Sequence, residues 1–75
     1  MTAKELANQI LGRGYKTMTA RQAEWFSNLA SQDPSIQFDL RNSSYSYTWR
    51  DGDKVIFVDV LRHGGYGAKI STCQA

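Results

Sequence analysis

The spacing of the apolar residues changes near Ile36, and this change constrains the fold more than any other feature of the sequence. Before this point, apolar side chains recur at helical spacing, as on one face of an α-helix. After it, they alternate with polar side chains, as in β-strands with one buried face. A helical half followed by a strand half predicts an α+β domain, in which helices pack on an antiparallel sheet.

The first predicted helix has a clear start and a clear end. Thr2 and Glu5 match the capping box, in which two side chains satisfy backbone N–H groups at the start of a helix. A stripe of alanine, leucine and isoleucine follows at helical spacing. Gly12 and Gly14 then supply a helix stop. We therefore expect a helix from about Ala3 to Leu11.

The second predicted helix repeats the same start signal with Thr19 and Gln22. Its apolar face continues at helical spacing, and Pro34 disfavours helical backbone in the residue before it. The helix should therefore end near Ser31. The two helices would form a hairpin across a glycine-containing turn.

The second half of the chain predicts an antiparallel sheet. Four segments show strand-like patterns, and Asp51-Gly52 between two of them is a strong hairpin signal. We expect a helical hairpin followed by a three- to four-stranded antiparallel sheet, in the order α-α-β-β-β-β, as one domain over residues 1–75. The predicted strand segments are Ile36–Leu40, Ser44–Arg50, Lys54–Arg62 and Ala68–Cys73.

Composition excludes several classes of protein. Hydrophobic residues make up 41% and charged residues 21% of the chain, which is typical of a globular domain rather than a disordered one. The first residues show no signal-peptide pattern, and the longest apolar run, Val55–Leu61, is too short to span a bilayer. Cys73 is the only cysteine, and a lone thiol fits a reducing compartment. We therefore expect a cytoplasmic protein that binds no membrane.

No constellation of residues predicts catalysis or a bound cofactor. One histidine, His63, and one cysteine are too few for a zinc site, and Asp51 and Asp53 lack the other oxygen ligands of a calcium loop. If Gly64–Gly67 closes a hairpin, His63 and Cys73 lie roughly 17 Å apart, too far for a nucleophile and its base. That glycine-rich segment matches no nucleotide-binding fingerprint. We therefore expect no catalytic residue, no metal, no cofactor and no enzymatic activity.

The segment Val55–Leu61 carries the main functional inference, because apolar side chains alternate on both of its faces. Two helices of roughly ten residues can cover only one face of a sheet. The other face should then expose an apolar, tyrosine-rich surface, and exposed patches of this kind usually mark an interface. Two alternatives remain open: the sheet coils enough to bury both faces, or the helices straddle it. One set of side chains is Ile56, Val58 and Val60, and the other is Val55, Phe57 and Leu61.

Aromatic residues of the preceding strand are the predicted partner contacts, because tyrosine, tryptophan and arginine dominate interface energies. The face that carries them depends on the hairpin register. A two-residue turn places the rings with Ile56 and Val58, whereas a three-residue turn places them with Val55 and Phe57. The same sheet face would also allow a homodimer. The predicted contacts are Tyr45, Tyr47, Trp49 and Arg50.

A nucleic-acid partner is the alternative, which the net charge of +2 permits without favouring. Basic residues and a tyrosine cluster around the turn between the helices, where phosphate contacts are physically reasonable. Further basic residues end the strands, and the aromatic strand that ends in Arg50 is similar to platforms that stack unpaired bases. The candidate nucleic-acid contacts are Arg13, Tyr15, Lys16, Arg21, Arg62 and Lys69.

Part of the chain resembles small bacteriophage-type proteins. The similarity lies in Met18-Thr19-Ala20-Arg21-Gln22 with Trp25-Phe26 and Leu29-Ala30 after it, and in the later Gly65-Tyr66-Gly67-Ala68-Lys69-Ile70. This resemblance implies a small binding protein that docks on a host or defence-system protein in the host cytoplasm and inhibits or adapts it, as anti-CRISPR proteins do. Some proteins with this pattern belong to DNA metabolism, which implies a nucleic-acid partner instead.

Overall fold

The computed structural model describes residues 1–40, 44–61 and 67–75. Over these ranges the chain forms two helices and one five-stranded antiparallel sheet, which confirms the predicted α+β class. Arg62, at the end of the third predicted strand segment, lies outside the described residues. The elements are α1 (Ala3–Gly12), β1 (Thr17–Met18), α2 (Ala20–Ala30), β2 (Gln37–Leu40), β3 (Ser44–Asp51), β4 (Lys54–Leu61) and β5 (Ala68–Gln74).

The strands lie in the order β1-β5-β4-β3-β2, and each neighbouring pair is antiparallel. The sequence predicted three or four strands, and β1 is the one it missed. This strand has only two residues, Thr17 and Met18, which pair with Lys69 and Ala68 at the edge of β5. Two residues are too few to show an alternating pattern, so no local signal marks β1 in the sequence.

Both helices begin where the sequence predicts, and each has a complete capping box. The Thr2 hydroxyl accepts a hydrogen bond from the Glu5 N–H at 3.1 Å, and the Glu5 carboxylate accepts one from the Thr2 N–H at 3.0 Å. Thr19 and Gln22 make the equivalent bonds at 3.1 and 2.9 Å. These bonds satisfy N–H groups that the first helical turn leaves without partners, and so they define the start of each helix.

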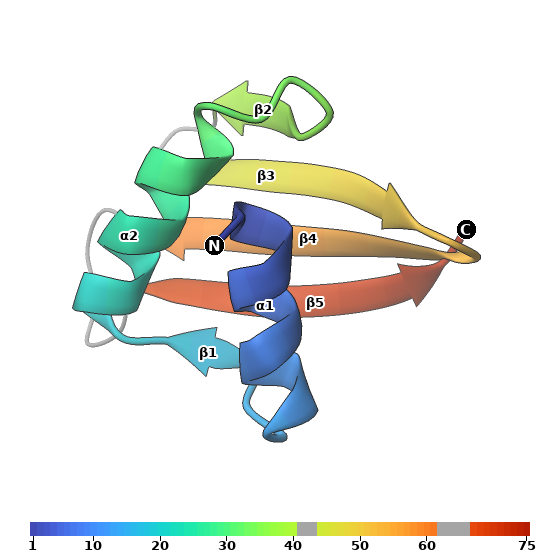
Figure 1. The fold of residues 1–75 in the computed structure, drawn as a ribbon, viewed down its shortest axis with the longest axis horizontal. Helices are drawn as coiled ribbons and strands as arrows, with labels where there is room; N and C mark the ends of the chain where they lie inside the picture. The colour runs from blue at the N-terminus through green and yellow to red at the C-terminus, as the bar shows by residue number, and fades with distance from the viewer. Residues whose placement is uncertain (41–43, 62–66) are drawn as a thin grey trace.

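Both helices lie on the same face of the sheet, as Figure 1 shows. The opposite face carries no helix in the part of the chain that the structure describes. The prediction that two helices cover one face is therefore confirmed, and the alternative in which they straddle the sheet is wrong. Neither helix is long and apolar enough to cross a membrane.

A two-residue turn sets the register of the β3–β4 hairpin. Asp51 pairs with Lys54, so Gly52 and Asp53 form the loop. Gly52 has a φ of 64°, whereas no described non-glycine residue has a positive φ. Glycine at the first loop position is the pattern of a type II′ turn, which suits the twist of a hairpin. Of the two registers left open by the sequence, the shorter turn is the one that forms.

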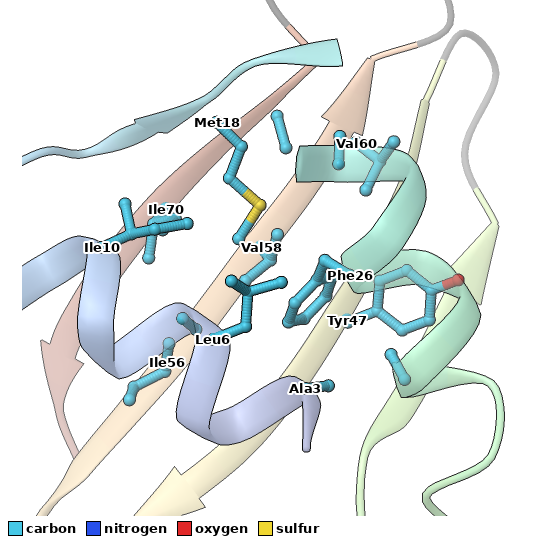
Figure 2. Close-up of a cluster of buried hydrophobic side chains, with 14 of the residues drawn as sticks. Ala3, Leu6, Ile10, Met18, Phe26, Tyr47, Ile56, Val58, Val60 and Ile70 are labelled. Carbon is cyan, nitrogen blue, oxygen red and sulfur yellow. The ribbon is translucent and has the colours of Figure 1, made fainter. Parts of the chain in front are cut away.

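The hydrophobic core lies between the two helices and the sheet face beneath them. Figure 2 shows Leu6 of α1 and Phe26 of α2 meeting Val58 near the middle of β4. Phe26 and Val58 are fully buried. Apart from the Asp51–Lys54 pair beside the turn, the helix-facing side of β3 and β4 consists of Tyr45, Tyr47 and Trp49 of β3 and Ile56, Val58 and Val60 of β4.

Candidate interaction surfaces

Two of the aromatic residues predicted to contact a partner are buried under the helices. Tyr47 is 6% exposed and Trp49 is 4% exposed. The two-residue turn pairs them with Val58 and Ile56, and directly paired residues point to the same face of a sheet. The predicted exposure of these two rings is therefore wrong, and both belong to the core. Burial raises the pKa of the Tyr47 phenol above its usual value.

The other two predicted contacts have different surroundings. Tyr45 is half-buried at the margin of the covered face, where its hydroxyl lies 3.5 Å from Ser27 Oγ of α2. Arg50 is exposed on the opposite face, and its Nε donates a hydrogen bond to the Gly52 carbonyl at 3.1 Å. Of the four predicted partner contacts, Arg50 is thus the one that lies on the face without helices.

The face without helices is called the open face below, and apolar residues run along its centre. Val55, Phe57 and Leu61 of β4, defined as the apolar strip, are all half-buried. Phe57 pairs with Thr48 of β3 and Ser71 of β5. Because these neighbours have short side chains, they leave the Phe57 ring partly exposed to solvent. The open face thus has an apolar strip but no tyrosine among the described residues, contrary to the predicted tyrosine-rich surface.

A row of polar and charged residues crosses the open face and interrupts the apolar strip between Phe57 and Leu61. Asp39 of β2, Ser46 of β3, Asp59 of β4 and Lys69 of β5 are successive partners in register. Opposite charges on paired residues, such as Asp59 and Lys69, stabilise a sheet. The open face therefore combines a small apolar centre with charged groups, as many protein interfaces do.

The most exposed apolar strand residues lie at the β2 edge of the sheet, which the sequence did not single out. Phe38 and Leu40 are 54% and 62% exposed, although they point to the same face as the buried rings of β3. The Phe38 ring lies 5.4 Å from the Tyr47 ring, centroid to centroid. Beside them, the end of α2 and the following loop enclose a hollow of about 490 Å³, lined by Ala30, Ser31, Asp33, Pro34, Ile36, Phe38 and Tyr47.

The candidate nucleic-acid contacts are only partly brought together. Arg13, Tyr15, Lys16 and Arg21 are all exposed, and Tyr15 is 62% exposed. Arg13 and Tyr15 line one hollow of about 440 Å³ together with Thr19 and Ala20 at the start of α2. Lys69 is exposed on β5, opposite Thr17. Arg62 falls outside the described residues.

The residues considered for chemistry are only partly described. Cys73 is a free, exposed thiol on β5, whereas His63 lies outside the described residues, as does most of the segment Gly64–Gly67. Within residues 1–40, 44–61 and 67–75, no three His, Cys, Asp or Glu side chains gather closely enough to hold a metal ion. The described geometry thus offers two apolar surfaces, the open face and the β2 edge, and two hollows with basic residues, one lined by Arg13 and the other by Lys16 and Lys69.

No protein-family model, no curated protein and no solved structure matches this chain.

Proposed function

We propose that this chain is a non-enzymatic binding protein that docks a partner protein on the open face of its sheet. The observation that carries the proposal is the apolar strip, since Val55, Phe57 and Leu61 are only partly buried on a face that neither helix covers. Burial of apolar area in a partner interface would stabilise the complex.

The charges around the strip define the chemistry of the partner. Arg50 pairs with Val55 at one end of the strip, and its exposed guanidinium can bind a carboxylate. A suitable partner therefore presents an apolar side chain to Phe57 and an acidic residue to Arg50. Binding by a tyrosine-rich surface is not part of this proposal, because Tyr47 and Trp49 are buried.

The partner is proposed to be a host or defence-system protein, which the chain inhibits or adapts. The support is the resemblance of the segment around α2 to small bacteriophage-type proteins, described above. Action in the cytoplasm is part of the same proposal, because Cys73 is an exposed free thiol and free thiols persist in reducing compartments.

Affinity capture from nuclease-treated bacterial lysate tests the proposal. The wild-type chain is expected to capture a protein that Phe57→Thr and Arg50→Glu each fail to capture. Threonine suits this position because it is a good strand former and matches the short polar neighbours of Phe57. Thermal unfolding must show that both variants remain folded at the temperature of capture, because Phe57→Thr also removes a partly buried ring.

Trp25→Ala provides the matched control, because Trp25 is a large apolar residue, 46% exposed, on a helix at the opposite side of the sheet. It should retain the captured protein. Capture that Trp25→Ala abolishes and Phe57→Thr leaves intact would place the docking surface on the helices and contradict the proposal.

A second candidate function is nucleic-acid binding, favoured by the hollow that Arg13 and Tyr15 share with the start of α2. Backbone N–H groups at a helix start and a guanidinium both attract phosphate, and a tyrosine ring can stack on a base. Titration with a single-stranded oligonucleotide tests this function. Its affinity should fall steeply as salt rises and should fall further in Arg13→Ala. Absence of binding at low salt would eliminate this candidate.

A further inference from the structure

The outer edge of strand β2 carries backbone groups that point away from the sheet, and one hydrogen bond shows which ones. The Leu61 N–H donates to the Gly67 carbonyl at 3.0 Å, so Leu61 of β4 directs its backbone groups toward β5. In antiparallel strands, successive residues direct these groups to opposite sides. Even-numbered residues of β4 therefore face β3, and their partners on β3 are Tyr45, Tyr47, Trp49 and Asp51.

The same alternation extends across β3 to the edge strand. Ser46 and Thr48 direct their backbone groups toward β2, where they pair with Asp39 and Gln37. It follows that the N–H and C=O groups of Phe38 and Leu40 point outward, away from β3. Strand β2 lies last in the strand order, so these groups form one edge of the sheet.

This edge has some but not all of the features that usually protect an exposed strand, since β2 is only four residues long and contains Asp39. Lysine, proline and bulges commonly prevent edge pairing. The segment Gln37–Leu40 contains neither lysine nor proline, and it pairs with β3 without interruption. The opposite edge of the sheet is different, because β1 is only two residues long and follows Lys16.

The β2 edge also combines a protruding side chain and a hollow that suit each other. Leu40 is 62% exposed at one end of the strand. At the other end lies the hollow of about 490 Å³, whose lining includes Pro34, Ile36 and Phe38. Both features lie on the helix-facing side of the sheet, because Leu40 and Phe38 share that side with Tyr47.

We propose that the β2 edge binds the β2 edge of a second copy of this chain, in antiparallel pairing about a two-fold axis at Phe38. Such an axis places each Phe38 opposite its counterpart and each Leu40 opposite Ile36 of the second copy. Each Leu40 then enters the hollow beside Ile36 in the other copy. In this arrangement the Leu40 side chain of each copy is buried and the hollow of each copy is filled. Both copies therefore make the same contacts, as an isologous interface requires.

The outward backbone groups match this register. The two Phe38 residues exchange a pair of N–H to C=O bonds across the axis. The Ile36 N–H already donates to the Asp33 carbonyl at 3.2 Å, which leaves the Ile36 carbonyl as the acceptor for the Leu40 N–H of the second copy. The dimer therefore pairs edge groups without breaking an existing bond.

Charge excludes one of the two nearest competing registers, the other having its axis at Gln37. An axis at Asp39 would place the two Asp39 side chains directly opposite each other, in the pair type that brings side chains closest. Like charges in that position are destabilising. An axis at Phe38 places Asp39 opposite the uncharged Gln37 instead. A shift of the pairing by one residue also fails, because directly paired residues point to the same side of a sheet. The apolar side chains of one copy would then lie on the side of the other copy's open face.

This dimer is independent of the proposed function, because it uses the strand edge and leaves the open face uncovered. The two open faces would become one continuous surface. A chain that self-associates but captures no partner would contradict the proposed function alone, and a monomer that captures a partner would contradict the dimer alone.

Sedimentation equilibrium of the intact protein over a wide range of concentration tests the proposal. The wild type is expected to shift reversibly from 8.5 kDa to twice that mass as concentration rises. Leu40→Lys should weaken the association at least about tenfold, since each copy loses a buried leucine and gains a charge at the edge. Trp25→Lys, a matched change of an exposed apolar residue on α2, should associate like the wild type. A wild type that stays monomeric throughout, or equal weakening by the two variants, would overturn the proposal.

A mixed sample of isotope-labelled and unlabelled protein tests the register. Nuclear Overhauser contacts between copies are expected from the Leu40 methyl groups to Pro34 and Ile36. A dimer in which these contacts are missing would overturn the two-fold axis at Phe38.

Discussion

The ring of Phe26 on helix α2 stacks on the ring of Trp49 on strand β3, with 5.9 Å between ring centroids and 28° between ring planes. The same ring meets Tyr47 edge-on at 5.4 Å. Phe26 thus contacts both rings that were predicted to bind a partner. Aromatic pairs at these distances stabilise a core beyond their buried area alone. The contact explains why these rings contribute to stability and not to an exposed surface.

Replacement of Trp49 is therefore expected to affect folding first. Trp49→Ala should lower the free energy of unfolding by about 3–5 kcal/mol, because it removes a buried ring and leaves a cavity beneath Phe26. Trp25→Ala, at a half-exposed position, should cost about 1 kcal/mol or less. Urea denaturation of both variants measures the difference. Equal effects would mean that Trp49 is not in the core.

Gly67 should tolerate no side chain, because it lies against the start of α2. A Cβ atom there would lie 2.6 Å from the Thr19 carbonyl oxygen, 2.7 Å from Ala20 Cα and 2.7 Å from Ala23 Cβ. Backbone atoms cannot move aside easily, so Gly67→Ala should destabilise by at least about 1–3 kcal/mol. Gly12→Ala is the control, since nothing lies within 4 Å of its added Cβ, and it should be neutral or stabilising. Thermal unfolding of the two variants provides the comparison.

Acid sensitivity should depend partly on Glu5. Hydrogen bonds from the N–H and then the hydroxyl of Thr2 hold the pKa of Glu5 below its usual 4.5. A carboxyl group whose pKa is lower in the folded state contributes stability above its unfolded pKa, and loses that contribution as pH falls through the folded value. This contribution should therefore disappear as pH falls below 4.5.

The second helix supplies the appropriate replacement, because Gln22 holds the equivalent position with a neutral side chain. Glu5→Gln should keep the helix start and lose this part of the acid sensitivity. The pKa of Asp33 is lowered by hydrogen bonds from Ser35, so Asp33 should still contribute to the acid sensitivity of this variant. Denaturation at a series of pH values measures how the free energy of unfolding changes with pH. An unchanged pH dependence in Glu5→Gln would contradict the contribution assigned to Glu5.

Proline substitutions test the direction of the backbone groups on β2. Leu40→Pro removes an N–H that points outward, so it should cost little stability in the dilute monomer. Gln37→Pro removes an N–H that faces β3 and leaves a carbonyl of Thr48 without its partner, which should cost about 1–3 kcal/mol. Chemical denaturation at low protein concentration compares them. The reverse order of stability would show that the outward groups are misassigned, and the dimer register would fail with them.

Features with local signals could be predicted from the sequence. The helix starts at Thr2 and Thr19 depend on side chains three residues away, and the turn at Gly52 depends on one glycine, so both are visible in a short segment. Strand β1 could not be predicted, because its two residues are held only by pairing with β5. Its partner lies about fifty positions along the chain, beyond the reach of any local pattern.

The candidate surfaces could be predicted only in part, because the exposure of a sheet residue depends on the width of the helical layer relative to the width of the sheet. Two short helices leaving one sheet face uncovered follows from helix length, and the structure agrees. The exposure of Phe38 and Leu40 does not follow, since their alternation with Gln37 and Asp39 is the pattern of a half-buried strand. The helical layer covers the central strands and leaves the side chains at the β2 edge without cover.

The sequence by itself determined the fold class, the two helices, the four longer strands and the presence of one uncovered face. Only the tertiary structure decided which side chains occupy each face. The reason is that strand side chains alternate with a period of two, so one additional loop residue at Gly52 would have exchanged the buried rings of Tyr47 and Trp49 with the residues of the open face. Local propensity selects the elements, whereas register and packing select the surface that a partner meets.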